Sequence, residues 1–203
     1  MVYATILTLT EKLARGIIIY VLNNTVNRRS LYLAIISVYP YGEYPFFDSL
    51  FLIITKLGDL GFIWILFSIV LLITKKYRLL GVLVLFNLLL TTVEVELLKH
   101  FVGRPRPFVV LPISPVLVSE APMASFPSGH SATSFAAAIM LSYGLPKYKN
   151  YFLGLAVLIA ISRLYLAVHF PTYVLMGAII GSLTSTLILY FYMRIKGRKP
   201  RFQ

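Results

Sequence analysis

Apolar residues in this chain gather in long uncharged runs, whereas the helices of a soluble protein carry narrower apolar stripes. Five such runs cover residues 60–74, 79–93, 131–146, 151–162 and 172–193. The last run exceeds the roughly 20 residues that a membrane-spanning helix needs. The others reach that length when flanking charges such as Lys75 and Arg163 lie near helix ends, where long side chains reach water. The pattern therefore predicts five transmembrane helices.

A further helix is predicted upstream, over residues 3–22, although Glu11 interrupts its apolar character. Residues 30–56 are predicted as interfacial segments broken at Pro40 and Pro45, so that 1–58 holds the first helix plus these segments. A signal peptide is the weaker interpretation, because no small-residue cleavage site follows. The predicted fold class is all-α: one membrane-embedded domain over 1–203, an integral membrane bundle of about six transmembrane helices.

Composition supports a membrane protein. The chain has 203 residues, of which 59% are hydrophobic and 13% charged, whereas soluble domains average about 45–50% apolar and about 25% charged. Its net charge of +12 would indicate nucleic acid in a soluble protein, but the apolar composition favours a membrane and no nucleic-acid partner. The absence of cysteine excludes disulfides, zinc–thiolate sites, iron–sulfur clusters and a cysteine nucleophile.

Basic residues predict the orientation. Ten cations lie in two turns and the C-terminal tail, namely Lys75, Lys76, Arg78, Lys147, Lys149, Arg194, Lys196, Arg198, Lys199 and Arg201. Alternating helices place these three regions on one side, which the positive-inside rule makes cytoplasmic. A nucleic-acid patch is the alternative interpretation of the tail. We therefore expect an integral protein of the plasma membrane, with its C-terminus in the cytoplasm.

The opposite face receives cations that lack nearby acids. Lys99, Arg104, Arg106 and Arg163 lie there together with His130 and His169, and residues 121–203 contain no Asp or Glu. Such cations favour an external anion, and phosphate suits the planar donors of Arg and the point charge of Lys. General contact with lipid headgroups is the alternative, above all for Arg104.

Residues 126–130 add a predicted anion site. Pro127 and Gly129 before an apolar run indicate a turn into a helix N-terminus, where backbone N–H groups and the helix dipole favour an anion. The Ser128 hydroxyl can donate to a phosphate oxygen, and Gly129 permits a close approach of the backbone. His130 then lies at the site as a group that titrates near neutral pH. A simple helix cap is the alternative interpretation.

Three motifs now occur in order: Lys99 followed after six residues by Arg106-Pro107, then Pro127-Ser128-Gly129-His130, then Ser162-Arg163 followed after five residues by His169. This ordered set resembles the signature of the type 2 phosphatidic acid phosphatase superfamily, which includes membrane lipid phosphate phosphatases. The motif core covers residues 99–173. The 57–59 turn before a helix and the final helix after the third motif also look like the six-helix members.

The resemblance implies a role for each matching residue. His169 would be the nucleophile that becomes a phosphohistidine, and His130 the general acid that protonates the leaving lipid oxygen. The phosphoryl oxygens would be held by Lys99, Arg106, Ser128, Gly129 and Arg163. Cationic donors in a partly dehydrated site supply the charge stabilisation that phosphoryl transfer needs, so we expect no cofactor and no metal.

One position departs from the family pattern. Four residues after its nucleophilic histidine the family has an aspartate, which orients the ring, and this chain has Tyr173. A neutral tyrosine accepts a hydrogen bond from histidine only weakly, so the sequence predicts impaired activity unless another acid compensates. The available acids near this face are Asp59, Glu94, Glu96 and Glu120, of which Glu96 is expected to form an ordinary pair with Lys99.

Two functions follow from the sequence. The first is a membrane phosphatase that hydrolyses a lipid phosphate or polyprenyl diphosphate at the non-cytoplasmic face. The alternative is a catalytically inactive relative that binds anionic lipid headgroups; a transporter is less favoured, because the histidines cluster at one interface. Gly177 and Gly181 predict close packing inside the bundle, and the oligomeric state is left open.

Overall fold

The computed structural model describes residues 45–110 and 121–196, and every regular element in these ranges is helical. The elements are α3 (Pro45–Gly58), η1 (Asp59–Gly61), α4 (Phe62–Ile73), η2 (Lys75–Tyr77), α5 (Arg78–Val102), α6 (Pro107–Val110), α7 (Gly129–Gly144), η3 (Pro146–Tyr148), α8 (Lys149–Tyr165) and α9 (Pro171–Lys196). The five helices predicted from the apolar runs are confirmed as helices α4, α5, α7, α8 and α9. The predicted helix over 3–22, Glu120 and the tail beyond residue 196 lie outside the described residues.

Within residues 45–110 and 121–196, three segments are long and apolar enough to cross a membrane. They are Pro45–Ile73 with 29 residues, Lys75–Val110 with 36 and Pro171–Ile195 with 25. Helices α7 and α8 have 16 and 17 residues, which is short of the roughly 20 that a full span takes. An integral membrane protein is therefore supported, and the count of about six spans stays a prediction.

Helix α3 differs from the sequence-based expectation. The pattern assigned residues 45–56 to interfacial segments, whereas the structure has a 14-residue helix that continues through η1 toward α4. Pro45 begins this helix, at the position where proline is tolerated. The chain bends after it because Leu60 and Gly61 adopt positive φ angles of 50° and 73°. Asp48 and Lys56 interrupt the apolar run, which explains why hydropathy did not separate this helix.

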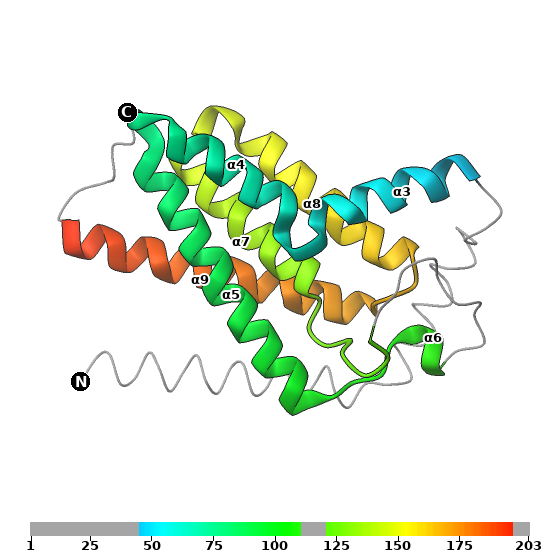
Figure 1. Cartoon of the computed structure of the whole chain (residues 1–203). Coiled ribbons are helices and arrows are strands. Elements are labelled where there is room, and N and C mark those ends of the chain that lie inside the picture. Colours follow the sequence, from blue (N-terminus) through cyan, green and yellow to red (C-terminus); the bar gives the residue numbers. More distant parts are fainter. Residues whose placement is uncertain (1–44, 111–120, 197–203) are drawn as a thin grey trace.

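Helix α7 is central in the bundle and packs against α5, α8 and α9 (Figure 1). Its small residues permit close approach, and Ala132, Ala136, Ala137 and Ala138 are fully buried. A Cβ atom on Gly177 or Gly181 would overlap the carbonyl oxygen of Ser128 or Ala132, respectively. The prediction that these glycines serve internal packing is therefore confirmed.

Buried polar groups connect the same three helices. The Asn87 amide on α5 donates to the Ala136 carbonyl on α7, at 3.0 Å, and to the Ser185 hydroxyl on α9, at 2.6 Å. Ser185 in turn donates to Ala136 at 2.6 Å. Such bonds between helices hold a bundle together where the surroundings cannot satisfy polar groups.

The outer surface of the bundle is apolar, and its two ends are polar. Large apolar side chains such as Phe62, Ile73, Leu89 and Leu187 are exposed, and lipid would cover a surface of this kind. The turns at η2 and η3 and the end of α9 lie toward the left of Figure 1, whereas α5 ends at the lower centre and α8 toward the right. The basic turns therefore share one end of the bundle.

Candidate active site

Helix α7 begins at the predicted anion site. Ser128 is its N-cap, and the Ser128 hydroxyl oxygen accepts hydrogen bonds from the Ser131 backbone N–H at 3.4 Å and the Ser131 hydroxyl at 3.1 Å. The Ser128 backbone N–H donates to the Tyr173 carbonyl at 3.1 Å. The predicted turn into a helix N-terminus is confirmed, and its backbone N–H groups and dipole favour an anion.

Lys99 lies beside this N-terminus, in the last turn of α5. Its Nζ atom is 3.6 Å from the position that a Cβ on Gly129 would occupy. Helix α5 ends one turn later at Gly103, whose φ of 53° and N–H bond to the Lys99 carbonyl form a left-handed C-cap. The expected pair of Lys99 with Glu96 is present, at 2.7 Å between Nζ and Oε1. Glu96 therefore neutralises Lys99 at the edge of the site.

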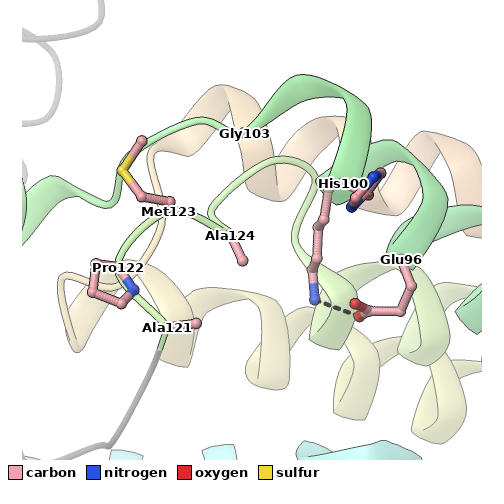
Figure 2. Close-up of a pocket in the computed structure, with 8 residues that line it drawn as sticks. Glu96, His100, Gly103, Ala121, Pro122, Met123 and Ala124 are labelled. Carbon is pink, nitrogen blue, oxygen red and sulfur yellow. Dashed lines mark hydrogen bonds and ion pairs between the residues drawn. The ribbon is translucent and has the colours of Figure 1, made fainter.

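A pocket opens beside Lys99. It lies between the end of α5 and the segment 121–124, with Lys99 and Glu96 on its α5 side, where Figure 2 labels Glu96 and His100. The facing wall comprises Ala121, Pro122, Met123 and Ala124. Lys99 thus lies between this pocket and the first turn of α7.

Arg106 is almost fully buried, and its guanidinium is fixed by backbone carbonyls. Its Nε donates to Ala121 at 2.7 Å, Nη1 to Val168 at 3.1 Å and Nη2 to Ala124 at 3.3 Å. The same Nη1 lies 3.3 Å from Nε2 of His169. Arg106 therefore holds the segment before α7 against the segment before α9 and directs positive charge at His169.

His169 has a different partner at each ring nitrogen. Its Nδ1 lies 2.7 Å from the Ser125 carbonyl oxygen, which can only accept a hydrogen bond. Its Nε2 faces the Arg106 guanidinium, which can only donate. Both contacts require the same tautomer, with the proton on Nδ1 and a lone pair on Nε2. The ring is 2% exposed, so these two partners fix it firmly.

The backbone before His169 is strained. Helix α8 ends at Tyr165, and Ala167 has a φ of 55°, which is uncommon for a residue with a Cβ. The Val168 N–H then donates to the Arg163 carbonyl at 3.3 Å. This tight turn brings His169 back toward the end of α8, and strain of this kind often occurs at functional sites.

The electrostatic surroundings keep His169 neutral. Burial, and then the positive charges of Arg163 and Arg106, lower the pKa of His169 well below its usual value of 6.5. Burial acts because a low dielectric disfavours the charged ring, and the two guanidinium groups repel it. A neutral imidazole with its lone pair on Nε2 is the nucleophilic form of histidine.

Tyr173 occupies the position where the sequence pattern leads us to expect an aspartate. Its side chain is 4% exposed and packs edge-on against Phe126 and Phe170, with ring centroids 5.1 and 5.2 Å away. The hydrogen bond from Nδ1 of His169 goes to the Ser125 backbone carbonyl. Sequence reasoning missed this acceptor, because a backbone carbonyl leaves no signature in residue type.

Helix α3 and the η1 turn that follows it supply three polar contacts that the sequence pattern did not predict. The Thr55 hydroxyl accepts a hydrogen bond from Arg163, and Asp48 accepts one from the Tyr165 hydroxyl at 2.6 Å. Asp59, at the end of this helix, lies 2.8 Å from Nε2 of His130. The scarcity of acids was the available signal, since it made each remaining carboxylate a candidate partner for a cation.

The site therefore joins all the residues predicted from the three motifs at one end of α7. Gly129 and His130 form part of its first turn, Lys99 lies beside that turn, and the charges of Arg106 and Arg163 act on His169. Among the described residues, no group of three or more His, Asp or Glu side chains is placed to hold a metal ion. Cationic side chains and two histidines thus lie together at one end of the helical bundle.

The sequence profile of the PAP2 superfamily matches residues 78–196, more than half of the chain, and the chain belongs to this superfamily. It is 34% identical over 108 residues to a lipid A 1-phosphatase of Rhizobium etli and 32% identical over 108 residues to one of Rhizobium johnstonii. Each match covers 48% of this chain, and 44% and 42% of these relatives. The chain thus matches less than half the length of these curated relatives.

Two solved structures share the fold over most of their length. LpxE of Aquifex aeolicus matches with a TM-score of 0.72 and 30% identity, over 82% of this chain and 97% of that one. A transmembrane PAP2-type phosphatidylglycerolphosphate phosphatase of Bacillus subtilis matches with a TM-score of 0.70 and 28% identity, over 93% of this chain and 98% of that one. The family resemblance inferred from the three motifs is confirmed.

Proposed function

We propose that this protein is a membrane phosphatase that hydrolyses a lipid phosphate or diphosphate through a phosphohistidine on His169. One observation carries the proposal: Nδ1 of the buried His169 lies 2.7 Å from the Ser125 carbonyl oxygen and Nε2 lies 3.3 Å from Nη1 of Arg106, which favours a ring with its lone pair on Nε2. The relatives named as lipid phosphatases support the same substrate class. The active site is proposed to face the non-cytoplasmic side, opposite the basic turns.

The reaction follows from the arrangement in two steps. In the first, Nε2 of His169 attacks phosphorus, the bond from phosphorus to the lipid oxygen breaks, and His130 gives a proton to that oxygen. In the second, water attacks the phosphohistidine, the P–N bond breaks, and His130 takes the proton that the water loses. Lys99, Arg106, Arg163, Ser128 and the Gly129 N–H hold the phosphoryl oxygens and stabilise their charge.

The Ser125 carbonyl supports activity in spite of Tyr173. An orienting aspartate would hold the proton on Nδ1, and the carbonyl does this at 2.7 Å. A neutral carbonyl stabilises the positively charged ring of the intermediate less than a carboxylate would. We therefore propose an active enzyme whose rate is below that of relatives with the aspartate.

The proposal is tested by release of inorganic phosphate from the purified full chain in detergent. Phosphatidic acid, phosphatidylglycerol phosphate, a lipid A 1-phosphate and a polyprenyl diphosphate are assayed, each with and without EDTA. We expect at least one substrate to turn over with EDTA present and His169→Ala to abolish turnover.

Trapping the intermediate tests the mechanism. Substrate labelled with ³²P should leave an acid-labile, alkali-stable label on the protein, which His169→Ala removes. Robust turnover in His169→Ala would refute the phosphohistidine step. Binding of anionic lipid vesicles without turnover of any substrate would instead support the inactive relative that binds headgroups.

A further inference from the structure

Residues 58 and 59 enclose one edge of the His130 ring. The Asp59 Oδ1 atom lies 2.8 Å from Nε2 of His130. A Cβ on Gly58 would lie 2.8 Å from Cδ2 of His130 and 2.7 Å from Cγ2 of Ile159. Since both distances are too short for a real Cβ, only glycine permits this approach. Gly58 and Asp59 thus contact the edge of the ring formed by Cδ2 and Nε2. The opposite edge, which carries Nδ1, points away from these two residues.

The chain direction at η1 makes this contact specific. Leu60 and Gly61 both have positive φ angles, and Leu60 is 96% exposed, so the bend does not serve to bury this leucine. The bend instead keeps Asp59 at the first turn of α7 before the chain enters α4. The four carboxylates of the described residues are Asp48, Asp59, Glu94 and Glu96. Their partners are Tyr165, His130, Thr184 and Lys99, respectively.

We propose that Asp59 is a positioning residue for His130, and this inference rests on the proposed phosphatase function. An ionised carboxylate can only accept a hydrogen bond, so Nε2 of His130 carries a proton and donates it in the hydrogen bond to Asp59. This proton stays on Nε2 during the reaction. Nδ1 then carries the proton of the imidazolium that moves to the leaving lipid oxygen as its bond to phosphorus breaks. When water attacks the phosphohistidine, Nδ1 takes the released proton, and the ring returns to its starting state.

The other charges around His130 oppose its protonated form. Lys56 on α3 and Arg163 on α8 act electrostatically on Asp59, Lys99 on α5 lies beside Gly129, and His169 interacts electrostatically with His130. Glu96 pairs with Lys99 at 2.7 Å, and Asp59 is the carboxylate in contact with His130. Because like charges disfavour a cation and an adjacent carboxylate favours it, Asp59 is needed to keep His130 as an acid.

The test compares Asp59→Asn with Asp59→Glu and with Asp48→Asn. Asp48 is a matched control, since it is a hydrogen-bonded carboxylate on α3, the helix that precedes Asp59, and it contacts Tyr165. We expect Asp59→Asn to lower kcat about 10- to 100-fold, which is at most the lower end of the roughly 10²–10⁴-fold contribution of general acid catalysis because His130 itself remains, with KM changed less than about threefold. In the pH profile of kcat, the alkaline limb of Asp59→Asn should move to lower pH. Asp59→Glu should recover much of the rate, and Asp48→Asn should keep the wild-type profile.

Two substrates with different leaving groups distinguish a loss of general acid catalysis from a general structural effect of Asp59→Asn. The aryl oxide that leaves from p-nitrophenyl phosphate is a good leaving group and needs little protonation. The lipid alkoxide that leaves from dioctanoyl phosphatidic acid is a poor leaving group and needs a proton from a general acid. The loss in Asp59→Asn should therefore be at least about tenfold smaller with the aryl phosphate. An equal loss with both substrates, or an unchanged kcat and pH profile, would overturn the inference and leave the phosphatase function intact. Absence of turnover in the wild type would instead refute the proposed function.

A measurement without substrate decides the matter where Asp59→Asn does not fold. The ¹⁵N shifts of labelled histidine in the wild-type protein, assigned with His130→Gln, report which nitrogen of His130 carries a proton. A protonated Nε2 at pH 7 is expected. An unprotonated Nε2 would refute the role of Asp59, whatever the enzyme assays show.

Discussion

At the scale of single residues, the site uses two histidines that differ in burial and partner. His169 is 2% exposed and faces cations and a carbonyl, whereas the side chain of His130 is 16% exposed and faces a carboxylate. Cations beside a buried ring favour its neutral form, and a carboxylate beside a ring favours its protonated form. The two environments therefore suit the proposed roles of His169 as nucleophile and His130 as acid.

The lowered pKa of His169 predicts how the protein responds to acid. In ¹⁵N spectra of substrate-free protein, assigned with His169→Gln, the ring should stay neutral with its proton on Nδ1 at pH 6.5, and titrate below that value. The folded-state pKa lies below the unfolded value of about 6.5. The stability contributed by the neutral ring is therefore complete above about pH 6.5 and is lost as the pH falls below it. A midpoint at or above 6.5 would contradict this electrostatic account.

Tyr173→Asp tests whether the backbone carbonyl replaces the aspartate. The substitution places a charge between Phe126 and Phe170 and removes a buried ring, so we expect a stability loss of about 3 kcal/mol, seen as a lower apparent Tm. Because Ser125 already orients His169, kcat should rise less than about tenfold, a small part of the roughly 10⁴-fold effect of an orienting carboxylate in a catalytic triad. A rise of about 100-fold or more would show that the carbonyl does not do the work of the carboxylate.

At the scale of elements, two helices position the site. Helix α7 presents its N-terminus because α9 approaches it closely at Gly177, where a Cβ would overlap the Ser128 carbonyl oxygen. Helix α3 contacts the ends of α7 and α8 through Asp59 and Thr55. The first contact holds the anion site in place, and the second holds the charged side chains around it.

Gly177→Ala should therefore damage the protein more than a typical helical glycine substitution. The new Cβ forces α9 away from α7, which we expect to cost about 1–3 kcal/mol and to lower activity, because Ser128 moves with the contact. Gly154→Ala on α8 is the matched control, since its Cβ meets nothing within 4 Å. The control should be neutral or stabilising by about 0.5–1 kcal/mol. Equal apparent Tm values for the two variants in thermal unfolding would contradict the packing argument.

The sequence predicted most of the helices and the residues of the site, but it missed helix α3 and the partners of the two histidines. Apolar runs predicted α5 and α9, and the motifs predicted that Lys99, His130 and His169 lie together. Both predictions succeeded because they depend on the types of side chain, which the sequence gives directly. Helix α3 was missed, since it carries Asp48 and Lys56 and forms an apolar span only together with α4. The partners of the two histidines were missed for a different reason: a carbonyl of residue 125 and a carboxylate of residue 59 come from distant parts of the chain.

At the scale of the whole molecule, the length of α8 predicts how deep the site lies. Lys149 begins α8 and Arg163 lies in its last turn, 14 positions later, which is about 21 Å at 1.5 Å per residue. The hydrocarbon core is roughly 30 Å thick. With Lys149 at one membrane surface, we therefore expect Arg163 to lie below the other. A cation at that depth needs a protein partner, and the Thr55 hydroxyl is such a partner for Arg163.

The absence of cysteine allows a direct test of which side of the membrane the site faces. Met123→Cys places a thiol at an exposed position beside the site, and Lys147→Cys places one in the exposed basic turn at the opposite end of the bundle. In spheroplasts of a bacterial host, an impermeant maleimide should label the Met123→Cys variant directly and the Lys147→Cys variant only after permeabilisation, because basic turns stay in the cytoplasm. The reverse pattern would place the site on the cytoplasmic side. Labelling of both variants from one side would show that the two ends do not face opposite compartments.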